Sequence, residues 1–212
     1  MKTVLAGVLA LAATVAATSG GATTITDPAG DFLSTYTGPQ GGDLDVLSFT
    51  VFIDKSNDFV ISATMNGAIG TTANTEYVFG VNTGGAGAPF TPFETHVLFN
   101  SVIVLNPDAT GIVVDNIASP TITPLGSVKV SGDTISAIVP ISLLPSTGLT
   151  PGQYGFNLWP RLTPMPFENI ADFAPNDGTF AAVPEPANWA LMILGFAGLG
   201  SAMRSRRRTA LA

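Results

Sequence analysis

Residues 46–53 read VLSFTVFI and residues 59–65 read FVISATM, and these two stretches decide the fold class. Apolar and small polar side chains alternate in both, with Ser48, Thr50, Ser62 and Thr64 on the polar side. A period of two is the signature of a β-strand with one buried face. The Asn57-Asp58 pair between the stretches is turn chemistry and predicts that they form a hairpin.

The same pattern returns along the chain at a spacing of about ten residues, with glycine and proline at the breaks. No stretch between the termini keeps a helical period of 3.6 residues. We therefore expect an all-β fold, a single β-sandwich domain over residues 23–176, followed by a linker at residues 177–183. The further expected strands are residues 77–81, 96–105, 111–117, 127–130, 134–139 and 154–159.

The N-terminus has the pattern of an export signal. Lys2 supplies the positive charge, residues 4–17 are almost wholly apolar, and small residues end at Ala22. This order predicts a signal peptide over residues 1–22, removed by signal peptidase. Cleavage after Ala17 and retention as an N-terminal anchor are the alternatives.

The C-terminus carries a second targeting pattern. Residues 184–190 read PEPANWA, and an apolar run to Met203 follows them. The run ends in a basic cluster formed by Arg204, Arg206, Arg207 and Arg208. An apolar segment with a positive end is retained in a membrane with its arginines on the cytoplasmic side. Residues 189–203 are fewer than the roughly 20 that a full span needs, so we expect a short transmembrane helix.

This tail resembles the C-terminal sorting signal of the PEP-CTERM family in its PEPxxWA variant. The matching motif residues are Pro184, Glu185, Pro186, Trp189 and Ala190. The resemblance covers residues 184–208 and implies recognition by an exosortase, a membrane protease-transpeptidase. It further implies a membrane-anchored precursor that is exported across the inner membrane and then delivered to the cell surface or extracellular matrix.

The charge between the two termini narrows the range of partners. Only Lys55, Lys129 and Arg161 are basic there, and all fifteen acids lie between Asp27 and Glu185, which gives a net charge of −12. Nucleic-acid binding needs clustered lysine and arginine, so this composition excludes it. The chain has no cysteine, and stability therefore has to come from a packed core.

An acidic cluster opens the predicted domain. Asp27, Asp31, Asp43 and Asp45 lie on stretches spaced by glycine and proline, where carboxylates can converge on calcium. The arrangement resembles the opening of some carbohydrate-binding or DOMON-like β-sandwiches. The alternative is that these aspartates cap turns through local hydrogen bonds. Calcium is the one cofactor that the sequence suggests.

Catalytic residues are scarce. His96 is the one histidine, which leaves little for a Ser-His-Asp arrangement or a zinc site. Paired carboxylates would have to draw on Glu76, Glu94 or Glu168, and Trp159 fits either a core or a sugar-stacking role. We expect a non-enzymatic surface or matrix protein. The alternative is a calcium-assisted carbohydrate-binding module whose partner is an extracellular polysaccharide.

Overall fold

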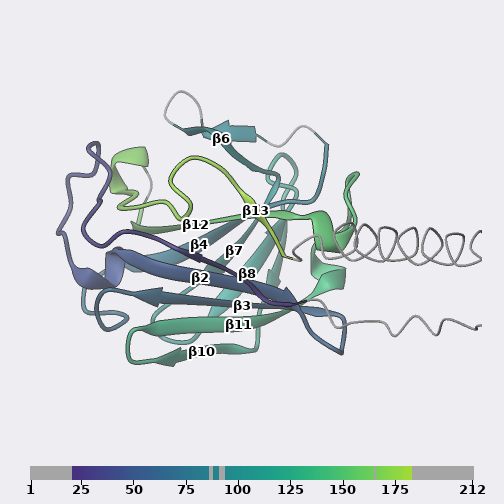
Figure 1. The fold of residues 1–212 in the computed structure, drawn as a ribbon, viewed down its shortest axis with the longest axis horizontal. Coiled ribbons are helices and arrows are strands. Elements are labelled where there is room, and N and C mark those ends of the chain that lie inside the picture. Colours follow the sequence, from purple (N-terminus) through teal and green to yellow (C-terminus); the bar gives the residue numbers. More distant parts are fainter. Residues whose placement is uncertain (1–20, 86–87, 91–93, 165, 183–212) are drawn as a thin grey trace, which may run out of the picture.

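The computed structural model describes residues 21–85, 88–90, 94–164 and 166–182. These residues form two packed antiparallel sheets, so the expected all-β sandwich is confirmed (Figure 1). The strands are β1 (Thr23–Thr26), β2 (Val46–Ile53), β3 (Asp58–Met65), β4 (Thr75–Asn82), β5 (Ala88–Phe90), β6 (Glu94–Phe99), β7 (Ser101–Leu105), β8 (Gly111–Asp115), β9 (Thr121–Pro124), β10 (Val128–Ser131), β11 (Thr134–Pro140), β12 (Gly155–Leu162) and β13 (Phe180–Ala181). Short 3-10 turns η1 (Gly42–Leu44), η2 (Ile141–Leu143), η3 (Pro151–Gln153) and η4 (Phe167–Asn169) join them.

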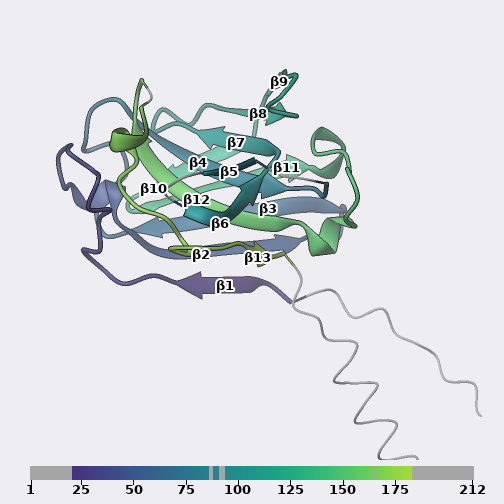
Figure 2. The same cartoon turned by 90° about the horizontal axis from the view of Figure 1, so that it is seen from above.

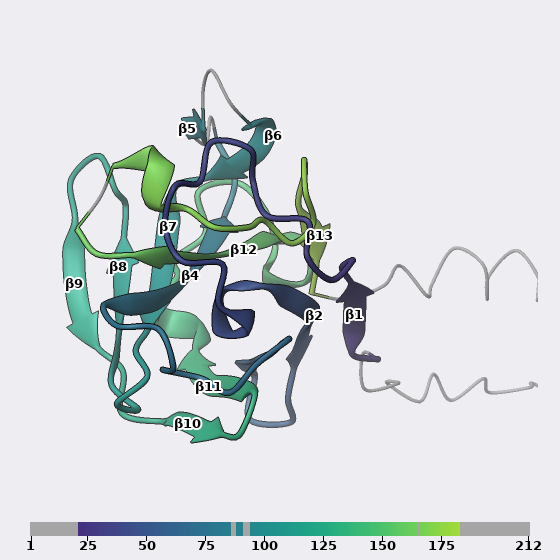
Figure 3. The same ribbon diagram turned by 90° about the vertical axis from the view of Figure 1, so that its left-hand side faces the viewer.

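The five-stranded sheet has the order β1-β2-β3-β11-β10, and the six-stranded sheet has the order β13-β12-β4-β7-β8-β9. The hairpin of β5 and β6 lies on the side of the six-stranded sheet that faces away from the five-stranded one (Figures 1 and 3). Seen from above, β1 and β9 lie at opposite sides of the molecule (Figure 2).

The expected hairpin of β2 and β3 is confirmed. Asn57 adopts a φ of 64° in its turn, a left-handed conformation that asparagine tolerates better than most residues. The fully buried residues are Val46, Phe49 and Val51 of β2 and Phe59, Ile61, Ala63 and Met65 of β3. Leu47 and Ile53 are only partly buried, and the register of β2 shifts between Val46 and Ser48. The core between the sheets is aromatic. Phe49 packs edge-on against Phe79 with the ring centroids 5.2 Å apart, and Phe59 packs edge-on against Phe156 with the ring centroids 5.3 Å apart.

A second apolar cluster covers the outer face of the six-stranded sheet. Trp159 of β12 is 2% exposed and contacts Phe90 of β5 and Phe99 of β6, with ring centroids 4.7 and 5.0 Å apart. Its ring lies over Gly80 of β4, where any Cβ would collide with it. Trp159 is therefore a core residue, which decides between its two sequence-based interpretations.

Several strands differ from expectation. The predicted strand at 96–105 is two strands, because the chain turns at Asn100, whose amide donates to Gly84 O (3.0 Å) and Thr147 Oγ1 (2.8 Å). The short strands β1, β5, β9 and β13 were not predicted. β13 pairs with β12 at Phe180, so the sheet continues into the stretch that the sequence assigns to the linker.

Two irregular segments run together beside β12. Residues 170–174, called here the strap, form bridges with β12, and Ala174 and Leu158 exchange backbone hydrogen bonds of 2.8 and 2.9 Å. Residues 27–41, called here the N-terminal loop, lie along the strap, and Leu33 N donates to Ala171 O at 2.9 Å. The loop therefore continues from the five-stranded sheet, and the strap belongs to the six-stranded one (Figures 1 and 3).

Candidate cation site

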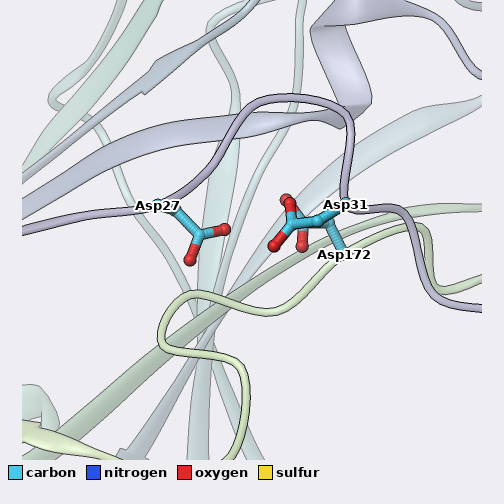
Figure 4. A group of neighbouring side chains, drawn as sticks. All are labelled: Asp27, Asp31 and Asp172. Carbon is cyan, nitrogen blue, oxygen red and sulfur yellow. The ribbon is translucent and has the colours of Figure 1, made fainter.

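Three carboxylates meet where the N-terminal loop, the strap and β2 come together. Asp27 follows β1, Asp31 lies four residues further along the loop, and Asp172 lies on the strap. One carboxylate oxygen from each can be chosen so that all three lie within 4.8 Å of one another. The three side chains point into the same space (Figure 4).

Asp172 is the deepest of the three and links the two sheets. Its side chain is fully buried, its Oδ2 accepts a 2.9 Å hydrogen bond from Val46 N, and its Oδ1 accepts a 2.7 Å bond from Phe173 N. Val46 is the first residue of β2, whereas Phe173 belongs to the strap. A buried carboxylate with two backbone donors is held in a fixed position.

Two oxygens of this group have no donor. Asp27 Oδ2 and Asp31 Oδ1 are buried and make no hydrogen bond within the described residues. Asp31 uses its other oxygen, Oδ2, to accept from Asn176 Nδ2 at 3.1 Å. Buried polar atoms in folded proteins nearly always have a partner, and an oxygen-binding cation is the partner that suits clustered carboxylates.

The electrostatics also show a deficit of positive charge. Burial, and then the nearby charges of Asp31 and Asp45, raise the pKa of Asp27 to about 7. Burial raises the pKa of Asp172 to about 8, with Asp27 and Asp31 adding to the rise and the bonds from Val46 and Phe173 opposing it. A divalent cation here would offset this repulsion and favour the ionised carboxylates.

The four aspartates named from the sequence divide into two pairs. Asp27 and Asp31 are brought together. Asp43 accepts hydrogen bonds from Thr72 N at 2.7 Å and Thr72 Oγ1 at 2.6 Å. Both oxygens of Asp45 accept from Gly30 N at 3.0 and 2.9 Å, and one also accepts from Asn66 Nδ2 at 2.8 Å.

Asp43 and Asp45 are thus supplied with donors, but these donors lie 15 to 29 positions away in the sequence and are not the local bonds of the turn-capping interpretation. Asp45 still contributes to the site, because its bonds hold the N-terminal loop at Gly30, between Asp27 and Asp31. The third carboxylate of the group is Asp172, which sequence reasoning missed. No spacing pattern connects it with residues more than 140 positions earlier.

Other chemistry-bearing residues lie apart. His96 Nδ1 contacts Asp177 Oδ2 at 2.7 Å, and the two side chains are 73% and 48% exposed. Glu76 forms an ion pair with Arg161, and Glu168 is exposed. The side chain of Glu94 lies outside the described residues. A surface hollow of about 250 Å³ is lined by Gly84, Gly85, Asn100, Asn116, Ile117, Ala118 and Thr147, none of which belongs to the carboxylate group.

Both targeting segments lie outside the described residues, apart from Gly21 and Ala22 at the end of the expected signal peptide. This holds for the whole PEPxxWA motif and for the four arginines behind it. Within the part of the chain that the structure describes, no helix has the length and apolar character needed to cross a membrane.

Comparison with known proteins adds no relative: no family model, curated protein or solved structure matches this chain. The resemblance of the C-terminal tail to a sorting signal stays a prediction from the residues themselves.

Proposed function

We propose that this chain is a non-enzymatic exported protein that reaches the cell surface or extracellular matrix through a C-terminal sorting signal. The observation that carries the proposal is the order of three features after residue 183: Pro-Glu-Pro with Trp189-Ala190, an apolar run, and four arginines. Signal peptidase would act at the N-terminus and an exosortase-type enzyme at the tail. Between them lies one β-sandwich domain.

The chemistry of the domain supports a non-catalytic role. Two carboxylates at the junction of the sheets, Asp27 and Asp172, have raised pKa values, and Asp27 lies on a loop that is bonded into the fold by Asp45. The His96–Asp177 pair lies on the surface instead of in a cleft. An acidic surface favours solubility outside the cell.

We propose further that Asp27, Asp31 and Asp172 bind calcium as a structural ion. The buried oxygens of Asp27 and Asp31 that lack donors support this assignment. Calcium takes six to eight oxygen ligands, so water and backbone carbonyls would complete the shell. The ion would fasten the N-terminal loop to the strap, and hence one sheet to the other. A calcium-assisted carbohydrate-binding module remains the second proposal.

Sorting is tested by replacing Pro184, Glu185 and Pro186 with alanine and fractionating the cells that produce the protein. We expect the full-length precursor to accumulate in the inner membrane, because the sorting enzyme can no longer recognise the tail. Pro145→Ala, an exposed proline of the domain, is the matched control and should mature normally. Normal maturation of the triple variant would reduce the tail to a simple anchor.

A further inference from the structure

The outer face of the five-stranded sheet carries two continuous rows of hydroxyl side chains. Strand register aligns one row across all five strands: Thr26, Ser48, Thr64, Thr134 and Ser131. It aligns a second row beside the first: Thr24, Thr50, Ser62, Ser136 and Lys129. Nine of these ten positions are therefore serine or threonine. We call this surface the hydroxyl face.

The spacing of the hydroxyl face is regular. Neighbouring strands lie about 4.8 Å apart, and same-face residues along a strand lie about 6.7 Å apart. Thr24 and Thr50, opposite each other in β1 and β2, share a 2.8 Å hydrogen bond between their hydroxyls. In the described part of the chain, the central residues Ser62, Thr64 and Ser136 have no side-chain hydrogen bond, and no segment crosses this face (Figures 1 and 3).

The charge of this face differs from that of the rest of the chain. Fifteen acids are present, yet neither row contains a carboxylate. Along these strands and their turns, the carboxylates lie at the strand ends, at Asp27, Asp45, Asp54, Asp58 and Asp133. A solvated sheet face needs polar residues, but it does not need to avoid charge. The one charge in the two rows is the cation Lys129 on the edge strand β10, so the positions on the other four strands are uncharged. Such a surface on an acidic protein suits a neutral polymer, since an anionic one is repelled by the surroundings.

A third row makes the surface amphipathic. Phe52, Val60 and Ile138 lie side by side next to the hydroxyl rows, and Ile138 is 40% exposed. Sugar units also present hydroxyl groups at their edges and apolar C–H groups on their faces. Hydroxyl side chains can both donate to and accept from such a ligand, directly or through water.

We infer that the hydroxyl face binds an uncharged polysaccharide. The chain would lie along the rows, across the strands, with its hydroxyls on Thr50, Ser62 and Ser136 and its apolar faces towards Phe52. Sheets twist by about 20–25° per strand, which a flexible glycan chain follows more readily than a planar lattice such as ice. The first row begins at Thr26, the residue before Asp27, but none of the three clustered carboxylates lies in either row. The inference deepens the carbohydrate-binding proposal and does not require calcium.

The test uses the full-length chain in a non-ionic detergent that contains no sugar, with cellulose, β-1,3-glucan and chitin as neutral polymers and alginate as the anionic one. We expect co-sedimentation with at least one neutral polymer and none with alginate. Ser62→Glu should weaken retention at least tenfold, and so should the double variant Thr50→Val/Ser62→Ala, which adds no charge. Ser119→Glu, in the exposed loop before β9, is the matched control and should bind like the parent protein.

Thermal unfolding checks that each variant is folded. If Ser62→Glu disturbs the sheet, the double variant provides the test instead. The inference would be overturned if no neutral polymer retained the parent protein. It would also be overturned if both variants were retained as strongly as the parent. Adsorption to growing ice without polysaccharide binding would overturn the inference in favour of ice as the ligand. Formation of a dimer that the double variant abolishes would overturn it in favour of a second copy of the chain. Each assay uses purified protein, so failure here is distinct from failure of sorting. Repeating it with EDTA separates the result from that of the calcium proposal.

Discussion

The two sheets of this sandwich differ in what lies on their outer faces. The five-stranded sheet shows hydroxyl side chains on its outer face. The six-stranded sheet is covered by the β5–β6 hairpin, the strap and the N-terminal loop, and Trp159 of β12 and Phe173 of the strap are buried between these layers. Their sequences reflect this: β2 and β3 alternate, whereas β4 has buried residues at Tyr77, Val78 and Phe79 in succession. A strand covered on both sides loses its alternation.

Removing Trp159 from the covered face of the six-stranded sheet should have the largest effect on stability. Trp159→Ala deletes the ring that contacts Phe90, Phe99 and Phe173, and such large-to-small core changes cost about 3–5 kcal/mol. The free energy of unfolding, measured by urea titration, should fall by that amount. A loss below about 1 kcal/mol would mean that the covering layer contributes little to stability.

The junction between the sheets should respond to pH. The raised pKa values of Asp27 (about 7) and Asp172 (about 8), against an ordinary 3.8, mean that the folded state keeps protons that the unfolded chain has released. Without calcium, this stability is full below pH 3.8 and is lost as pH rises through 7 to 8. We therefore expect a lower melting temperature at pH 8 than at pH 5 in EDTA.

The control for the pH dependence is Asp172→Asn, which removes one titrating group while keeping its shape. The difference in melting temperature between pH 5 and pH 8 should shrink in this variant. A melting temperature that rises with pH in the parent protein would contradict the assigned carboxylate environment.

Sequence alone predicts most of the longer strands of this fold. Alternation identified β2, β3 and β11, which have one buried face, and strands at 77–81 and 154–159 were also expected, within β4 and β12. It missed β1 and β9, which have four residues each, β5, which has three, and β13, which has two, because strands this short show too little alternation. For the carboxylate group, local spacing identified Asp27 and Asp31. Asp172 comes into the group only through the pairing of the strap with β12, which no local pattern encodes.

A substitution on the hydroxyl face should leave the free energy of unfolding nearly unchanged, even where it weakens polysaccharide binding. Thr64→Val keeps a β-branched side chain at the centre of the hydroxyl face, and surface changes of this kind usually stay within about 0.5 kcal/mol. Urea unfolding should give nearly the parent free energy, in contrast to Trp159→Ala. A loss above about 2 kcal/mol would show that something packs on this face.

The most direct test of the account is calorimetric titration of calcium into the full-length chain at pH 7, with thermal unfolding followed in parallel. If Asp27, Asp31 and Asp172 hold a structural ion between the sheets, binding should be saturable at one site and should raise the melting temperature. Asp31→Asn should weaken it at least tenfold, whereas Asp108→Asn, in an exposed turn, should leave it unchanged. The absence of both heat and a shift in melting temperature would contradict the cation site.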